Sequence, residues 1–194
     1  INEIGRMIML YREDIKEYLG IDEKIASDNY FEFEEYQAKF NDYQNKDKWY
    51  EDSGKVYLGR QIVVNNPEKP SIQYKTILDS IGTEYQYTGL DFACGASPIG
   101  FELIKRGHNL IFCDLPGSVT YEFLRWRLNK YNMPFKSITD LSEVESKSMD
   151  FILALDCIEH FPEDKSKDIV NQFARILREN GYLYCNFMAN HAFE

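Results

Sequence analysis

The sequence has few cysteines, and no two of them form a metal-binding pair. Cys94, Cys113, Cys157 and Cys185 are spread along the chain, and no CxxC pair occurs. Only Cys157 and His160 have the spacing of a ligand pair, and no second pair completes them. We therefore expect no metal site and four reduced thiols. Free thiols of this kind suit a reducing compartment, so the sequence predicts a cytoplasmic protein.

The chain also lacks an excess of positive charge and any long apolar run. It has 22 Lys and Arg residues against 32 Asp and Glu residues, a net charge of -10, so the broad cationic surface that holds a phosphate backbone is missing. No apolar run approaches the roughly 20 residues that span a bilayer. Nucleic acid and membrane are therefore disfavoured as partners. With 194 residues, 44% of them hydrophobic, the chain predicts a globular fold.

The first part of the chain, residues 1–85, differs in amino-acid composition from the rest. It holds nine of the fourteen tyrosines and predicts a mainly helical, aromatic-rich extension, with a boundary at residues 82–88. Apolar residues at helical spacing predict helices over residues 4–19 and 29–46, and an extended segment is expected at residues 55–64. The aromatic rings have two open roles: packing against the second part, or a lid over a functional site.

Strands and helices alternate in the second part, residues 86–194. Such alternation favours an α/β fold with a Rossmann-like, mainly parallel sheet flanked by helices. Arg127 lies in one of the expected helices, and we expect the cluster it forms with Arg125 and Trp126 to be a solvated face with one buried aromatic rather than an anion site. Strands are expected at residues 87–94, 109–113, 135–138, 149–155 and 182–188, and helices at residues 98–106, 119–131 and 165–179, the last closed by Asn180 and Gly181.

The turn after the first strand is the segment most suited to ligand binding in such a sheet. It reads Leu90-Asp-Phe-Ala-Cys-Gly-Ala-Ser-Pro-Ile-Gly100. A P-loop would need Lys and a hydroxyl where Phe101 and Glu102 stand. A dinucleotide fingerprint would need glycine where Ser97 stands, so a nicotinamide-dependent oxidoreductase is a weaker third candidate.

The same turn resembles the first motif of the class I S-adenosylmethionine-dependent methyltransferases, an acidic residue followed by a turn of the form D-x-G-C-G-x-G. Asp114, which ends the second strand, resembles the acidic residue that binds the cofactor's ribose. Residues 139–141 resemble the segment beside the adenine, and residues 154–161 resemble the end of the fourth strand, with its Glu-His pair. The resemblance covers about residues 86–190, and it implies S-adenosylmethionine as cofactor.

The resemblance also implies roles for individual residues. Asp91 would anchor the loop and the cofactor's amino-acid end, and Asp156 would face either the methionine portion or the acceptor. Asp140 would lie by the adenine, with a helix cap as the other open interpretation. His160 is the candidate catalytic base, although it could instead fix the turn that follows it. The cofactor-binding candidates are Asp91, Ala93, Gly95, Asp114, Leu115, Asp140, Leu141 and Asp156.

Two departures from the family pattern affect the expected function. Ala93 stands where the family usually has glycine, and the chain stops soon after the fifth strand, so we expect the last strands of the usual sheet to be missing and the domain to be C-terminally incomplete. The predicted activity is methyl transfer to a small molecule or a protein side chain. The alternative is a methyltransferase-like module that binds a ligand or a protein without catalysis. The sequence does not set the acceptor or the oligomeric state.

Overall fold

A computed structural model describes residues 1–40 and 46–186, with the side chains of residues 46 and 47 excepted. The chain divides into two compact units. The first unit is Ile1–Ile81 with Leu115–Asn132, and the second is Gly82–Asp114 with Met133–Glu194. The chain therefore passes between the units three times, once directly after Asp114.

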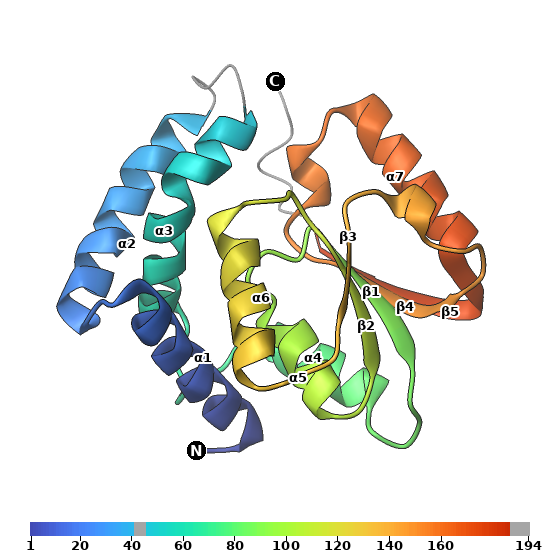
Figure 1. Ribbon diagram of the computed structural model, residues 1–194, viewed down its shortest axis with the longest axis horizontal. Helices are drawn as coiled ribbons and strands as arrows, with labels where there is room; N and C mark the ends of the chain where they lie inside the picture. The colour runs from blue at the N-terminus through green and yellow to red at the C-terminus, as the bar shows by residue number, and fades with distance from the viewer. Residues whose placement is uncertain (41–45, 187–194) are drawn as a thin grey trace. The chain divides into compact units, whose positions relative to one another are not determined.

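The first unit is helical throughout its regular structure (Figure 1). Asn2 caps the first helix by accepting from the N–H of Gly5, and Gly20 ends it with a φ of 66°. The helical character expected for the N-terminal part is confirmed. None of the helices in the described ranges is both long and apolar enough to cross a bilayer. The helices of this unit are α1 (Glu3–Leu19), α2 (Glu23–Ala38), α3 (Lys46–Val64), α4 (Ile72–Ile81) and α6 (Val119–Lys130).

Residues 55–64, expected to be extended, belong to helix α3, so that expectation is wrong. Leu58 and Ile62 are fully buried and lie four residues apart, on one face of the helix. A Cβ at Gly54 would lie 2.9 Å from Cβ of Val119 on α6, and one at Gly59 would lie 2.1 Å from the side chain of Asn29 on α2. Gly54 and Gly59 are thus places where α3 meets its neighbours closely.

Helix α2 begins and ends earlier than expected. Asp22 caps it by accepting from the N–H of Ile25, and it ends at Ala38 instead of running to residue 46. Residues 41–45 of the expected range lie outside the described residues.

The aromatic residues of α2 and α3 pack on one another. The ring of Phe33 lies 5.9 Å from that of Trp49 and 5.2 Å from that of Tyr57. Trp49 is buried, and its Nε1 donates to the carbonyl of Tyr36 at 2.8 Å. These rings form a core within the first unit, because each is partnered by another side chain of the same unit.

Arg127 is fully buried, so the expectation of a solvated cluster on α6 is wrong for this residue. Its Nε donates to Oδ2 of Asp14 on α1 at 2.7 Å, and Asp14 is itself only 1% exposed. Lys130 and Tyr131 also donate to Asp14, both at 2.8 Å. Paired charges of this kind satisfy one another inside a helical unit.

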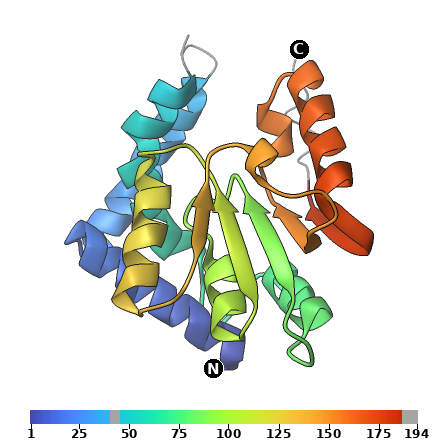
Figure 2. The same ribbon diagram turned by 45° about the vertical axis from the view of Figure 1, so that its right-hand side comes forward.

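The second unit is built on a parallel sheet whose strands have the order β3-β2-β1-β4-β5 (Figures 1 and 2). All four pairings are parallel, which confirms the α/β class and the Rossmann-like sheet. The strands are β1 (Thr88–Phe92), β2 (Asn109–Cys113), β3 (Lys136–Ile138), β4 (Met149–Ala154) and β5 (Leu177–Cys185).

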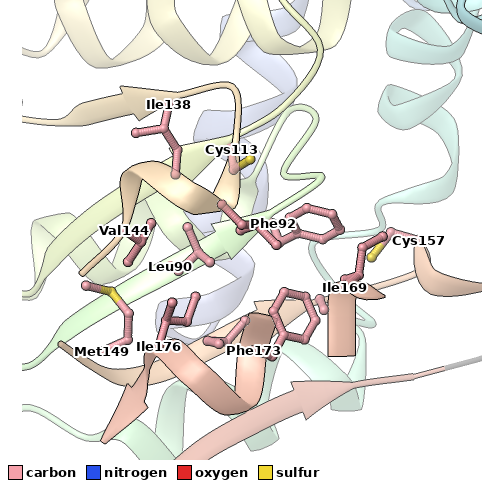
Figure 3. Close-up of a cluster of buried hydrophobic side chains, with 13 residues drawn as sticks. Leu90, Phe92, Cys113, Ile138, Val144, Met149, Cys157, Ile169, Phe173 and Ile176 are labelled. Atoms are coloured by element: carbon pink, nitrogen blue, oxygen red, sulfur yellow. The ribbon is translucent and has the colours of Figure 1, made fainter. Parts of the chain in front are cut away.

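Helices α5 (Pro98–Lys105) and α7 (Glu163–Ile176) pack against opposite faces of this sheet. Leu90 and Phe92 of β1 join Phe173 of α7 in one buried hydrophobic cluster, which Figure 3 shows. Asp91 points to the other face, because strand side chains alternate. Its carboxylate lies beside Gly100 of α5.

The end of α7 differs from the expectation. The helix ends at Ile176 and β5 follows at once, so residues 177–179 are not helical. Asn180, with a φ of 65°, lies inside β5 with Gly181, at an irregularity where the partner of Met149 is Leu177 but that of Phe151 is Tyr182. The turn signal of Asn180 and Gly181 therefore marks a bulge in the strand.

Candidate functional site

The expected ligand-binding residues of the second unit lie at or just beyond the carboxyl ends of its strands. Because all strands are parallel, these ends meet at one edge of the sheet. Ala93 and Gly95 follow β1, Asp114 follows β2, Asp140 follows β3 and Asp156 follows β4. Leu115 is the exception, since it belongs to the first unit and is 42% exposed.

The loop after β1 has a left-handed backbone at alternate residues. The φ angles are 50° at Ala93, 50° at Gly95 and 35° at Ser97. Glycine adopts this conformation freely, whereas an L side chain is strained there. Ala93 therefore takes the backbone form that the family's usual glycine favours, despite its methyl group.

Asp91 and Ser97 hold the base of this loop. The Ser97 hydroxyl donates to Oδ2 of Asp91 and accepts from the N–H of Gly100 at 3.1 Å, which caps α5. Burial raises the pKa of Asp91 to about 7, against the opposing effect of the Ser97 hydrogen bond and with a further rise from Asp114. A Cβ at Gly100 would lie 2.3 Å from the Ser97 oxygen, so this close packing requires glycine.

Asp114 connects the same loop to β2. Its Oδ2 accepts from the N–H of Gly95 at 2.6 Å, and the N–H of Cys94 donates to the carbonyl of Cys113 at 3.3 Å. The side chain of Asp114 is half-buried. A carboxylate oriented in this way at a strand end can accept hydrogen bonds from a pair of hydroxyl groups.

Asp140 is a helix cap, which is one of the two interpretations left open by the sequence. It accepts from the N–H of Ser142 at 2.7 Å, and Glu143 accepts in return from the N–H of Asp140 at 3.1 Å. The hydrogen bond from Ser142 lowers the pKa of Asp140. Leu141 is 7% exposed and packs in the hydrophobic cluster. Its side chain is therefore part of the core.

Asp156 forms a reciprocal pair with Asn186, a residue that the sequence reasoning missed. The N–H of Asp156 donates to Oδ1 of Asn186 at 2.7 Å, and Nδ2 of Asn186 donates to Oδ1 of Asp156 at 2.5 Å. Asp156 has a φ of 49°. The only sequence signal for Asn186 is its position directly after the apolar run of β5.

His160 is the last residue of the short helix η3 (Ile158–His160), and it is exposed. Its N–H donates to the carbonyl of Cys157 at 3.0 Å. Ser166 of α7 donates its hydroxyl to the carbonyl of Ile158 at 3.2 Å and so fixes the helix that carries the imidazole.

The electrostatic character of the edge is acidic. The segments at the strand ends, residues 93–97, 114, 139–141 and 155–160, contain four Asp or Glu residues and no Lys or Arg. Such an edge disfavours a pyrophosphate and favours cationic or hydroxyl-bearing groups. Among the residues that the structure describes, no group of three or more His, Cys, Asp and Glu side chains is placed to hold a metal.

Residues 90–185 match the family model described as a methyltransferase domain. Compared with curated proteins, the chain has no significant sequence match. Among solved structures, it is similar to the PH0226 protein of Pyrococcus horikoshii OT3, with 19% identity over 59% of this chain and 52% of that chain and a TM-score of 0.51. It is also similar to phosphoethanolamine N-methyltransferase 2 of Haemonchus contortus, solved with S-adenosyl-L-methionine, with 20% identity over 60% of this chain and 28% of that chain and a TM-score of 0.51.

These structural similarities show the fold, and the chain spans about half of the length of the first of these structures. The family match covers the segment from β1 to the end of β5. The matched segment contains nearly all of the parallel sheet and the glycine-containing turn after β1. Residues 90–185 therefore form a methyltransferase domain, with the parallel sheet typical of the class I S-adenosylmethionine-dependent methyltransferases.

Proposed function

We propose that this chain binds S-adenosylmethionine at the carboxyl ends of β1, β2 and β4 and transfers its methyl group to a small molecule or a protein side chain. The observation that carries the proposal is the contact between Gly95 and Asp114, which places a left-handed loop and a carboxylate together at the end of neighbouring strands. A loop of this shape allows close approach of a ligand to the backbone.

The residues present fit this cofactor. Asp114 has carboxylate oxygens suited to ribose hydroxyls, and Asp156 provides a negative charge for the ammonium of the methionine portion. The acidic edge suits a cationic ligand and opposes a dinucleotide, which argues against the oxidoreductase alternative. Ala93 is no obstacle, because its backbone already has the left-handed form.

The cofactor supplies an electrophilic methyl group on a sulfonium. The chain's own residues orient the ligands and hold a proton. Asp91 and Ser97 fix the loop, Asp114 orients the ribose, and His160 is exposed and can take a proton from an acceptor near neutral pH.

A role of residues 1–85 as a lid over the acceptor belongs to the same proposal. So does a cytoplasmic location, which four free thiols support.

The test is calorimetry with S-adenosylmethionine and S-adenosylhomocysteine, with NAD as the control ligand. We expect both sulfur compounds to bind and to raise the melting temperature, because a ligand that binds only the folded state stabilises it. Binding of NAD alone would refute the proposal. The His160→Asn variant should bind the cofactor normally. If the wild type methylates an acceptor and the His160→Asn variant does not, the chain is a catalyst and not only a binding module.

A further inference from the structure

We propose that Asn186 is a positioning residue that fixes both the backbone and the carboxylate of Asp156 at the carboxyl end of β4. The inference rests on the proposed function, since it assigns Asp156 to ligand binding. It adds a residue, directly after β5, that the chain needs for this purpose.

The pairing between the two residues is specific to an amide side chain. Asp156 presents a donor, its backbone N–H, and an acceptor, its Oδ1. Asn186 provides the complementary acceptor, Oδ1, at 2.7 Å from the backbone nitrogen and the complementary donor, Nδ2, at 2.5 Å from the carboxylate oxygen. A carboxylate at position 186 would face another carboxylate, and an aliphatic side chain would offer neither group. The two contacts also fix the orientation of the amide, because the flipped amide would lose both hydrogen bonds.

The pair also supports an uncommon backbone conformation. The φ of 49° at Asp156 lies in the left-handed region, which Asp tolerates better than most residues but does not prefer. The hydrogen bond from the N–H of Asp156 to Asn186 holds the chain in this form directly after β4. Residues 157–160, including His160, follow this turn and depend on its direction.

One carboxylate oxygen of Asp156 is left for a ligand. Oδ1 accepts from Asn186, whereas Oδ2 has no hydrogen bond within the described part of the chain. Asp156 is exposed, Asn186 is half-buried and the hydrogen bond between their side chains is exposed, so the pair contributes little to the stability of the fold. Its effect is to restrict the rotation of the carboxylate, which lowers the entropy that ligand binding must remove.

The experiment compares Asn186→Ala and Asn186→Asp with the wild type. We expect affinity for S-adenosylhomocysteine to fall roughly tenfold in both variants, with the melting temperature nearly unchanged. Hydrogen exchange of the Asp156 amide should accelerate, because its acceptor is removed or misplaced. Asn171→Ala, which removes an exposed amide side chain on α7, is the matched control for Asn186→Ala and should bind normally.

The exchanged pair, Asp156→Asn with Asn186→Asp, separates geometry from charge. It restores the complementary hydrogen bonds, so slow exchange at residue 156 should return, while the affinity stays low because the carboxylate has moved to position 186, directly after β5. Unchanged affinity in Asn186→Ala, unchanged exchange at Asp156, or a large loss of stability would each overturn the inference. Failure of the wild type to bind the cofactor would instead refute the proposed function. Hydrogen exchange of the Asp156 amide would still test whether Asn186 holds Asp156 in place.

Discussion

The backbone N–H of Gly95 donates to Oδ2 of Asp114 at 2.6 Å, which joins the loop after β1 to the end of β2. The residues are 19 positions apart in the chain, and the parallel pairing of the two strands brings them together. The same carboxylate is proposed to bind the ribose. The shape of the loop and the ribose contact therefore depend on one side chain.

Replacing Asp114 with alanine should weaken binding of S-adenosylhomocysteine by roughly 10- to 100-fold, the equivalent of about 1.5–3 kcal/mol for a lost charge-assisted hydrogen bond. Calorimetry measures the change, and circular dichroism checks that the fold is kept. Asp168→Ala, which removes an exposed carboxylate on α7 away from the strand ends, is the matched control and should bind normally. An unchanged dissociation constant would remove Asp114 from the site.

Replacing Ala93 with glycine should raise the free energy of unfolding by about 0.5–1 kcal/mol, because relief of the left-handed penalty exceeds the added backbone entropy of glycine. Ala93→Val should lower it, since a branched side chain is more strained at a φ of 50°. Urea denaturation measures both effects. Equal stability of all three proteins would show that the loop relaxes to another conformation.

The buried carboxyl of Asp91 should make stability depend on pH. Its pKa is raised from 3.8 to about 7 in the folded protein, so the folded state holds the proton more tightly than the unfolded state does. The stabilising contribution is present at about pH 4, falls as the pH rises towards 7, and is constant above that. Asp91→Asn removes this titration.

Denaturation of Asp91→Asn and wild type between pH 4 and pH 8 tests this expectation. The difference in unfolding free energy should move in favour of the variant as the pH rises, by a few kcal/mol at most. A difference that is independent of pH would mean that Asp91 is ionised throughout the range.

Breaking the ion pair between Asp14 and Arg127 should strongly destabilise the first unit. Arg127→Met leaves the buried Asp14 carboxylate without its 2.7 Å partner, a change that costs about 3–5 kcal/mol when one member of a buried pair is removed. Lys130→Met is the matched control. Lys130 contacts the same carboxylate but is 28% exposed, and its loss should cost at most about 1 kcal/mol. Similar effects of the two variants in thermal melts would contradict this expectation.

The four thiols should react with a thiol reagent in a fixed order. Cys185 is exposed and should react first. Burial raises the pKa of Cys113 to about 12 and raises the pKa values of Cys94 and Cys157, so their reactive thiolates are scarce at neutral pH. A colorimetric thiol assay should show one fast group and three slow ones in the native protein. Four fast groups in the folded protein would contradict the burial of Cys113 and Cys157 and the partial burial of Cys94.

Short-range patterns in the sequence were enough to predict the α/β class and the acidic and glycine residues at the strand ends. Strand and helix alternation follows from local periodicity, and the topology of a parallel sheet brings all carboxyl ends to one edge. Asp91, Gly95 and Asp114 could therefore be assigned to one site from the sequence, although they are separated along the chain.

Other features depend on contacts that no local pattern contains. Residues 55–64 have strand-like composition but are helical, because Leu58 and Ile62 find a helical core and Gly59 admits Asn29. Arg127 is buried because Asp14, 113 positions away, neutralises it. Asn186 meets Asp156 because β5 pairs with β4. In each case the decisive partner lies on another element, and only the packing of that element supplies the burial, charge or hydrogen bond that fixes the residue's role.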